Sequence, residues 1–450
     1  MEQYLFHTNL QIPILSLING LVLLSGFYFF GQIIITKTIL KKVLERYSFI
    51  DYQNILITVI IISFFFYPLI LFIEDSLVLL KITTYLLFLF GAYSIILNSK
   101  TFFEKLKVNI NNKKINFKIQ NIEIIILFFL ITGYFLISIA PVTNADSLDY
   151  HLYTGKYILN YSGYPKFLTN FHSTRLSGSG EIFISMGLLV GSEQFSSVLQ
   201  FSGIISLIGI FRKLNFSKIN FILLLSAPVI IFFSSSLKPQ FFQICASGFV
   251  FLIIIKELYN KKINKNLDTI ILLFCSTILF LNTQVKFSFF LSAYLLSFLL
   301  IFLSFKKKIF IKFILLNFIL YFLIIFPPLI WKYNNFGGNF FELLYSPFTT
   351  NLYGLEYFKS YLTNLNKGNF VWIIVPQHYR ELTQSLGIGC FIFIYLIFKS
   401  NNKTDFLILF IIILFLLITY FHGQNTARFL LEPYIWIILY FSLKFINIKF

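Results

Sequence analysis

Charged residues are scarce in this chain of 450 residues, and acidic residues in particular. Asp, Glu, Lys and Arg make up 12% of the sequence, only 18 residues are acidic, and 58% are hydrophobic. The mean hydropathy is +0.82, and so few charges cannot cover a soluble domain with a solvated surface. The composition therefore excludes a soluble globular protein and indicates a polytopic membrane protein.

Cysteine is also rare. The three cysteines, Cys245, Cys275 and Cys390, all lie inside apolar runs. Their odd number and wide spacing indicate neither a disulfide framework nor a metal site. We expect them to be packing residues of the membrane interior.

Long apolar runs recur along the whole chain, and a membrane-spanning helix needs roughly 20 apolar residues. The first stretch holds Glu2 but no Lys or Arg, and no small-residue cleavage site follows, so we expect a retained helix and not a signal peptide. We count about thirteen crossings, at residues 10–35, 54–74, 77–97, 123–141, 193–211, 219–236, 240–257, 268–283, 286–304, 309–331, 384–398, 405–422 and 427–443.

Positive charge sorts the loops into two sets. Six lysines lie between Lys100 and Lys118, and alternate loops elsewhere hold most of the other basic residues. Because positively charged loops stay in the cytoplasm, this pattern predicts a multi-pass protein of the bacterial inner membrane with its N-terminus outside. The same sorting, with contact to membrane lipids, explains the net charge of +18 without a nucleic-acid partner.

This topology divides the chain into two parts. Residues 1–120 contain the N-terminal transmembrane helices and a basic cytoplasmic loop, and residues 121–450 contain the remaining transmembrane region. Two long loops, residues 142–192 and 332–383, lie on the outer face. The fold class we predict is an all-α helical bundle with partly helical outer loops that cap a cavity open to the bilayer.

Two of the few carboxylates lie together where the first outer loop begins. The segment reads Asp146-Ser147-Leu148-Asp149-Tyr150-His151. Asp146 either shares a helix face with Asp149 or caps the helix that follows. An acidic pair at the edge of the bilayer indicates chemistry or ion binding at this position.

The rest of this loop predicts further structure. Asp149 to Asn160 is typical of an amphipathic helix on the membrane surface, and Ser162-Gly163-Tyr164-Pro165 is typical of a turn. A small-residue loop, residues 173–181, then leads into the next hydrophobic segment. The apolar side of the helix would contain Tyr150, Leu152, Tyr153, Tyr157 and Leu159.

Three parts of the chain carry a resemblance to a known family. The first outer loop opens with Asp-x-x-x-Tyr-His and ends with Gly-x-Gly-Glu at residues 178–181. Residues 331–339 are aromatic and rich in Asn and Gly, and residues 424–433 contain an Arg-aromatic-Leu-x-x-Pro pattern. All three segments are predicted to lie at the outer face of the membrane. Together they resemble the GT-C superfamily of membrane glycosyltransferases over about residues 120–445. Ser147 stands where several members have Glu.

The resemblance implies an enzyme that takes a sugar from a polyprenyl-phosphate carrier. Such an inverting hexosyl- or pentosyltransferase passes the sugar to a lipid, glycan or protein acceptor at the outer face. Asp146 matches the catalytic base of the family. Independently of the family, a carboxylate at this boundary suits the deprotonation of an acceptor hydroxyl, and a second carboxylate stabilises an oxocarbenium-like transition state.

The other candidate residues follow from this chemistry. Asp149 assists Asp146 or binds a divalent cation with it, and no cofactor or metal is otherwise indicated. His151 orients the base or contacts a phosphate. The leaving phosphate needs cationic donors, for which we select Arg428, Lys286, Lys238 and Arg380, and for acceptor binding we select Glu181 and Arg175.

Simpler roles stay open for several of these residues. Arg428 is four residues before Glu432, so the two could form an ion pair on one helix face. Lys238 and Lys286 could extend to the lipid headgroups, and Glu181 could be only solvated. Two other functions also stay open: a surface-polysaccharide polymerase or ligase that works through outer-loop Arg residues, and a transporter or flippase of lipid-linked sugars.

Overall fold

The computed structural model describes residues 13–47, 53–112, 119–142, 147–166, 177–260, 263–336, 374, 385–422 and 427–445. These residues form helices and contain no strand. The elements are α2 (Pro13–Lys37), α3 (Leu40–Tyr47), α4 (Asn54–Phe72), α5 (Ser76–Asn112), α6 (Ile119–Ile139), η2 (Ser147–His151), α7 (Leu152–Tyr161), α8 (Gly180–Leu189), α9 (Phe195–Lys213), α10 (Lys218–Leu225), α11 (Val229–Ser234), α12 (Phe241–Tyr259), α13 (Lys265–Val285), η4 (Phe287–Phe289), α14 (Phe290–Lys306), α15 (Phe310–Phe336), η6 (Ile388–Cys390), α19 (Phe391–Phe398), α20 (Lys403–His422) and α21 (Ala427–Lys444).

Within the described ranges, nine helices are long and apolar enough to cross a membrane. They are α2, α4, α5, α6, α9, α12, α13, α15 and α20. Each matches one of the thirteen predicted crossings. The all-helical, multi-pass character predicted from composition is therefore confirmed, while the full count of thirteen stays a prediction.

The other four predicted crossings are shorter, broken or more charged helices. The predicted crossing at 219–236 is split into α10 and α11, because Pro228 supplies no N–H donor and restricts the residue before it. α14 has 17 residues and α19 has eight. α21 has 18 residues but contains three charged side chains, those of Arg428, Glu432 and Lys444.

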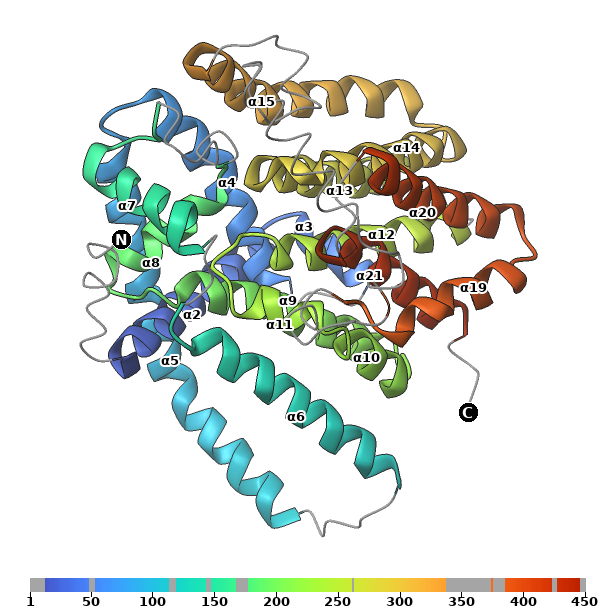
Figure 1. Cartoon of the computed structure of the whole chain (residues 1–450), viewed down its shortest axis with the longest axis horizontal. Helices are drawn as coiled ribbons and strands as arrows, with labels where there is room; N and C mark the ends of the chain where they lie inside the picture. Colours follow the sequence, from blue (N-terminus) through green and yellow to red (C-terminus); the bar gives the residue numbers. More distant parts are fainter. Residues whose placement is uncertain are drawn as a thin grey trace.

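The helices are buried to very different degrees. The most apolar stretch of α12 is 94% buried, whereas that of α6 is 11% buried. A helix that is hydrophobic all round belongs in the core of a large protein or in a membrane. α12 therefore forms the centre, with α9, α13, α14 and α21 packed around it, and α6 lies at the edge along α9 and α10 (Figure 1).

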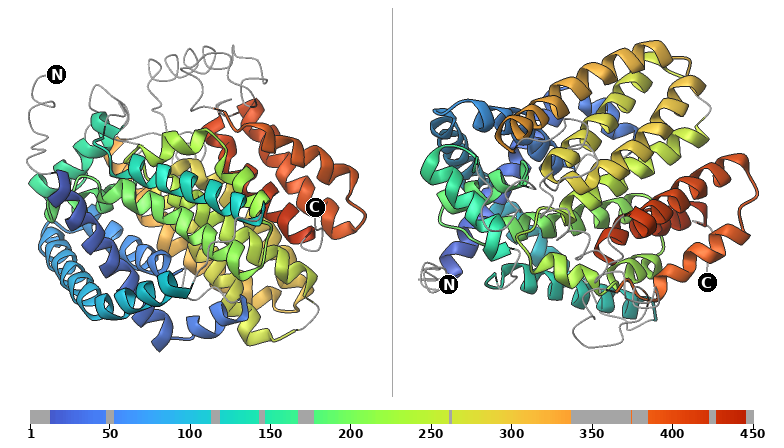
Figure 2. Two further views of the ribbon diagram at one scale, coloured as in Figure 1. Left: turned by 90° about the horizontal axis from the view of Figure 1, so that it is seen from below. Right: turned by 45° about the horizontal axis from the view of Figure 1, so that its top comes forward.

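The N-terminal helices are joined to the rest by packing. α2 crosses α5 so closely that a Cβ at Gly26 would lie 1.9 Å from the carbonyl oxygen of Leu87. Glycine at such crossings lets two membrane helices approach each other. α2 also packs against α9, and α4 packs against α13 and α15. On one side of the bundle, α19 and α20 pack against α21 (Figure 2), which in turn packs against α12.

The first outer-loop helix differs from its prediction. It begins as the π-helix η2 and continues as α7, and its buried side holds Leu152, Thr154 and Ile158, not the tyrosines. Gly155 lies against α8, where its carbonyl oxygen accepts a hydrogen bond from Ser185 Oγ at 3.0 Å. Tyr153 and Tyr157 are only partly buried, because the protein, and not lipid, covers the apolar side. The predicted turn is confirmed, since Ser162 ends α7 with a φ of 57°.

The cysteines behave as the sequence predicts. Cys245 and Cys275 are buried and free, and Cys390 is partly buried and free. They act as packing residues.

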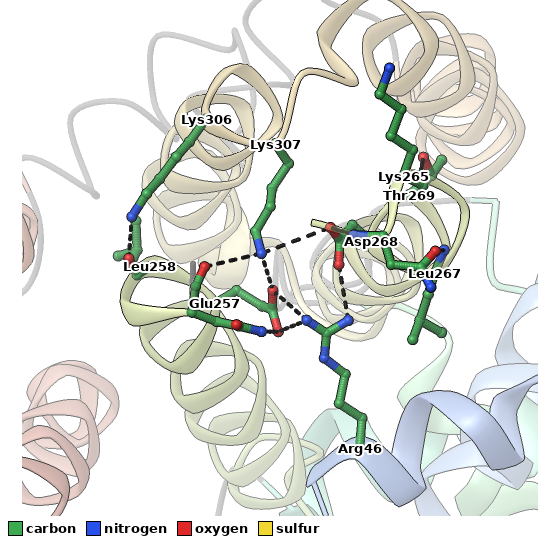
Figure 3. A network of polar contacts seen from close by, with 11 residues as sticks. Arg46, Glu257, Leu258, Lys265, Leu267, Asp268, Thr269, Lys306 and Lys307 are labelled. Atoms are coloured by element: carbon green, nitrogen blue, oxygen red, sulfur yellow. Dashed lines mark hydrogen bonds and ion pairs between the residues drawn. The ribbon is translucent and has the colours of Figure 1, made fainter. Parts of the chain in front are cut away.

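A network of buried charges joins one end of α12 and α13 to neighbouring elements (Figure 3). Arg46 of α3 binds Glu257 at 3.0 Å and Asp268 at 2.9 Å. Lys307, just after α14, binds Glu257 at 2.9 Å. The side chains of Glu257, Asp268 and Lys307 are at most 3% exposed. Because two acidic groups face two basic groups, the network is neutral and links four elements.

Candidate active site

A second polar cluster lies at the opposite end of α12 and α13. Its central contact is a hydrogen bond of 2.8 Å between His151 Nδ1 and Glu181 Oε1. The two side chains are 2% and 1% exposed. His151 ends the π-helix η2 and Glu181 lies in the first turn of α8, so the packing of α7 on α8 brings the two groups together.

The second carboxylate oxygen of Glu181 is also occupied. The backbone N–H of Gly178 donates to Glu181 Oε2 at 2.8 Å, and the hydroxyl of Tyr164 donates to the carbonyl of Gly178 at 2.6 Å. A Cβ at Gly178 would lie 2.1 Å from the carbonyl oxygen of Gln284, which explains the glycine. The small-residue loop predicted here is therefore pressed onto the end of α13.

Ser147 connects the acidic segment to a neighbouring loop. Its hydroxyl lies 3.0 Å from Ser236 Oγ and accepts a hydrogen bond from the backbone N–H of Leu237 at 3.1 Å. Lys238 follows directly, with only 4% of its surface exposed and its Nζ 5.7 Å from the ring centre of Phe232. Ser147 thus holds η2 beside the loop that carries Lys238.

Three lysines act on the pair from different elements. Burial lowers the pKa of His151 well below its usual value, and the charges of Lys286 and Lys238 lower it further. Burial raises the pKa of Glu181 to about 7, although Lys286, Lys332 and the hydrogen bond from Gly178 act in the opposite direction. The neutral imidazole is therefore the resting form of His151.

The other nitrogen of the His151 ring differs from the first. His151 Nε2 is buried and has no hydrogen-bond partner among the described residues. The ring of Tyr150 lies against the imidazole, with ring centres 4.0 Å apart. One ring nitrogen is thus fixed by Glu181, and the other is available to a reacting group.

Two cavities lie between α13 and α15, close to this cluster. A small one, of about 20 Å³, is lined by Lys332, Gln284 and Tyr67 among others. A larger one, of about 160 Å³, shares Thr283 with the first and has mostly apolar walls. The two cavities extend from the lysine end of the site toward the helices α14 and α15.

The sequence-predicted residues are thus only partly brought together. His151, Glu181, Lys238 and Lys286 form one cluster, while Arg428 begins α21, where its guanidinium lies 5.1 Å from the ring centre of Phe429. Asp146, Arg175 and Arg380 lie outside the described residues, and Asp149 is described only as part of the backbone of η2.

Glu181 has protein partners that the sequence did not predict. We expected it to bind an acceptor, but both of its oxygens bind protein groups. Sequence reasoning also missed Lys332, which is 7% exposed near the end of α15. Its signal was a lysine directly after a long apolar run, since charges within membrane helices are usually functional.

Metal binding stays open. Among the described residues, no group of three His, Cys, Asp or Glu side chains could hold a metal ion. The predicted cation site at Asp146 and Asp149 involves side chains outside that part of the chain.

Fold and site together define a multi-pass helical membrane protein with a buried acid–base pair beside three lysines. The chain belongs to the DUF1420 family, because the family model described as the DUF1420 N-terminal domain matches residues 96–450. No curated protein and no solved structure matches the chain. The match begins within α5 and includes His151, Glu181 and the three lysines of the site.

Proposed function

We propose that this protein is a glycosyltransferase of the GT-C type that uses a polyprenyl-phosphate-linked sugar at the outer face of the bacterial inner membrane. The observation that carries the proposal is the buried His151–Glu181 pair with lysines around it. An acid–base pair serves proton transfer, and lysines serve a phosphate leaving group. Both are needed to transfer a sugar from a phosphate carrier.

The roles follow from the chemistry of each group. Asp146, one residue before Ser147, is the proposed general base of the attack. Lys238 and Lys286 bind the phosphate of the donor, and Lys332 stands near the cavities between α13 and α15. The mostly apolar walls of the larger cavity suit the part of the prenyl tail next to the phosphate. The acceptor is a lipid, a glycan or a protein.

The proposed topology has about thirteen crossings with the N-terminus outside. It is supported by the separation of the two polar clusters along α13. Asp268 belongs to the ion-pair network and Gln284 contacts the site loop. At about 1.5 Å of rise per residue, these positions are about 24 Å apart, which is close to the roughly 30 Å of a bilayer core.

The proposal is tested with the purified protein in proteoliposomes that contain polyprenyl-phosphate sugars. We expect transfer by the wild type and its loss in Asp146→Asn. Asp75→Asn is the matched control, because Asp75 is an exposed aspartate between α4 and α5, on the same predicted face. Full activity of Asp146→Asn would refute the assignment of the base. Loss of activity in Arg380→Ala alone would point to a polymerase or ligase instead.

A transporter of lipid-linked sugars is the second candidate, and one observation favours it. α10 and α11 form a broken pair, and the irregular residues 235–240 after α11 contact η2 through Ser147. Broken helices beside a binding site are typical of transporters. Movement of a fluorescent lipid-linked sugar across vesicles, unaffected by Asp146→Asn, would favour transport over transfer.

A further inference from the structure

The two nitrogens of the buried His151 ring differ in their hydrogen bonding. Nδ1 bonds to a carboxylate at 2.8 Å, and Nε2 is buried without a hydrogen-bond partner. Because Glu181 accepts from the N–H of Gly178 on its other oxygen, its orientation is fixed. A carboxylate held in this way keeps the proton of a neutral imidazole on Nδ1, so that Nε2 carries a lone pair.

We propose a proton relay in which His151 is the final acceptor of the proton that Asp146, the proposed base, removes from the acceptor hydroxyl, and in which Glu181 is the positioning residue of His151. This inference rests on the proposed glycosyl transfer. The acceptor oxygen forms a bond to C1 of the sugar, and the bond between C1 and the phosphate oxygen breaks with its electron pair on the phosphate. The proton released by the acceptor hydroxyl ends on His151 Nε2, and the carboxylate of Glu181 stabilises the imidazolium.

The charges around His151 make its strength as a base depend on whether the phosphate donor is bound. The groups that act on the pair are Lys238 after α11, Lys286 at the end of α13 and Lys332 of α15, with Tyr67 of α4 and Tyr164 on the side of Glu181. The positive charges of the lysines disfavour an imidazolium before the phosphate of the donor binds. A phosphate bound between the lysines offsets their charge. Donor binding therefore raises the pKa of His151 and strengthens the base at the time it is needed.

The first test observes the ring directly and needs no turnover. Protein labelled with ¹⁵N-histidine is placed in nanodiscs, and the His151 signals are assigned as those missing from His151→Asn. We expect Nδ1 alone to carry the ring proton at a pH above about 7, where the pair has lost its extra proton. We also expect Glu181→Gln to move a share of it to Nε2, because an amide can donate to Nδ1. Glu74→Gln, an exposed change between α4 and α5, should leave the signals unchanged.

Donor coupling is measured in the same samples. Farnesyl phosphate should raise the pH at which Nε2 gains its proton by at least about half a unit, and farnesol, which lacks the phosphate, should not. A proton on Nε2 in the wild type well above pH 7, where the pair has lost its extra proton, would overturn the proposal. So would a His151 titration that farnesyl phosphate leaves unchanged.

The second test uses turnover. Asn at position 151 keeps an N–H donor for Glu181 at the place of Nδ1 but has no group at the place of Nε2. We therefore expect a folded variant whose transfer rate is reduced about 100-fold or more, the usual contribution of a general base. If the wild type transfers sugar and His151→Asn does so at the same rate, the relay is refuted while the proposed function stands. If the wild type transfers no sugar, the proposed function fails and the relay fails with it, while the ring measurements still report which nitrogen of His151 carries the proton.

Discussion

Replacement of Lys307 by methionine gives a direct measure of the ion-pair network in Figure 3. Lys307 Nζ lies 2.9 Å from Glu257 and 3.8 Å from Asp268, and it donates to the carbonyl of Asn260 at 3.2 Å. Methionine fills a similar volume without the charge. The variant leaves the two buried carboxylates with Arg46 as the remaining basic side chain of the ion pairs described above.

The expected cost follows from the charge balance. The wild-type network has two positive and two negative groups, and the variant carries one uncompensated negative charge in a nearly dry site. Removal of one partner from a buried pair costs about 3–5 kcal/mol. Because the side chain of Arg46 is 18% exposed and water therefore reaches the network, we expect a value near the lower end, about 3 kcal/mol.

The free energy of unfolding is measured by reversible SDS titration of the protein in mixed micelles. Lys312→Met is the control, since Lys312 is an exposed lysine near the start of α15, and we expect it to be close to wild type. The double variant Lys307→Met with Asp268→Asn restores neutrality and should recover more than half of the loss. A single variant as stable as the control, or a double variant less stable than the single, would refute the reasoning.

Two further predictions concern the site. Gly178→Ala places a Cβ 2.1 Å from the carbonyl oxygen of Gln284, so we expect a loss of about 3 kcal/mol in the same titration. Gly133→Ala, with no atom within 4 Å of the added Cβ, should instead be neutral or stabilising; equal effects of the two changes would contradict this view of the loop. The transfer rate should rise as the pH rises through about 7, because the His151–Glu181 pair holds an extra proton below that value and Nε2 cannot then accept another. In Glu181→Gln this limb of the pH–rate profile should move to lower pH, toward the lowered pKa of His151 alone, and an unmoved limb would exclude the pair as its origin.

The membrane character of the fold could be predicted from the sequence because it depends on composition alone. Nine long apolar helices follow the predicted runs, and the turn at Ser162 follows from local residue preferences. The count of crossings is harder to predict. Pro228 divides one apolar run, and α21 has only 18 residues, three of which are charged. An apolar run shows that a helix can be buried, but not whether lipid or protein covers it.

The buried face of α7, the first helix of the outer loop, illustrates that limit. Tyr153 and Tyr157 are amphipathic, and the sequence alone assigns them to the apolar side. In the structure, Ile158 is fully buried, while the two tyrosine rings lie 6.0 Å apart on the more exposed side. Local periodicity cannot tell that α8 covers this helix.

The pairing of the site residues depends on contacts distant in sequence. His151 and Glu181 are 30 residues apart, and Ser147 and Ser236 are 89 residues apart. Each of these residues could be selected as polar and unusual, but no pattern in a single sequence shows which one faces which. Glu181 was consequently assigned to the acceptor, although the fold makes it a partner of His151. Lys332 was overlooked because it lies at the end of a long apolar run.

The two polar clusters of this protein allow a structural role to be separated from a chemical one. In the network at Glu257 and Asp268, each carboxylate has a basic partner and the charges match, an arrangement that holds helices together and leaves little to react. At the other end of α12 and α13, one carboxylate is fully engaged in fixing a ring whose second nitrogen has no hydrogen-bond partner among the described residues. Burial of such a group is unfavourable unless something binds to it. That imbalance is the physical reason to look for the reaction at His151.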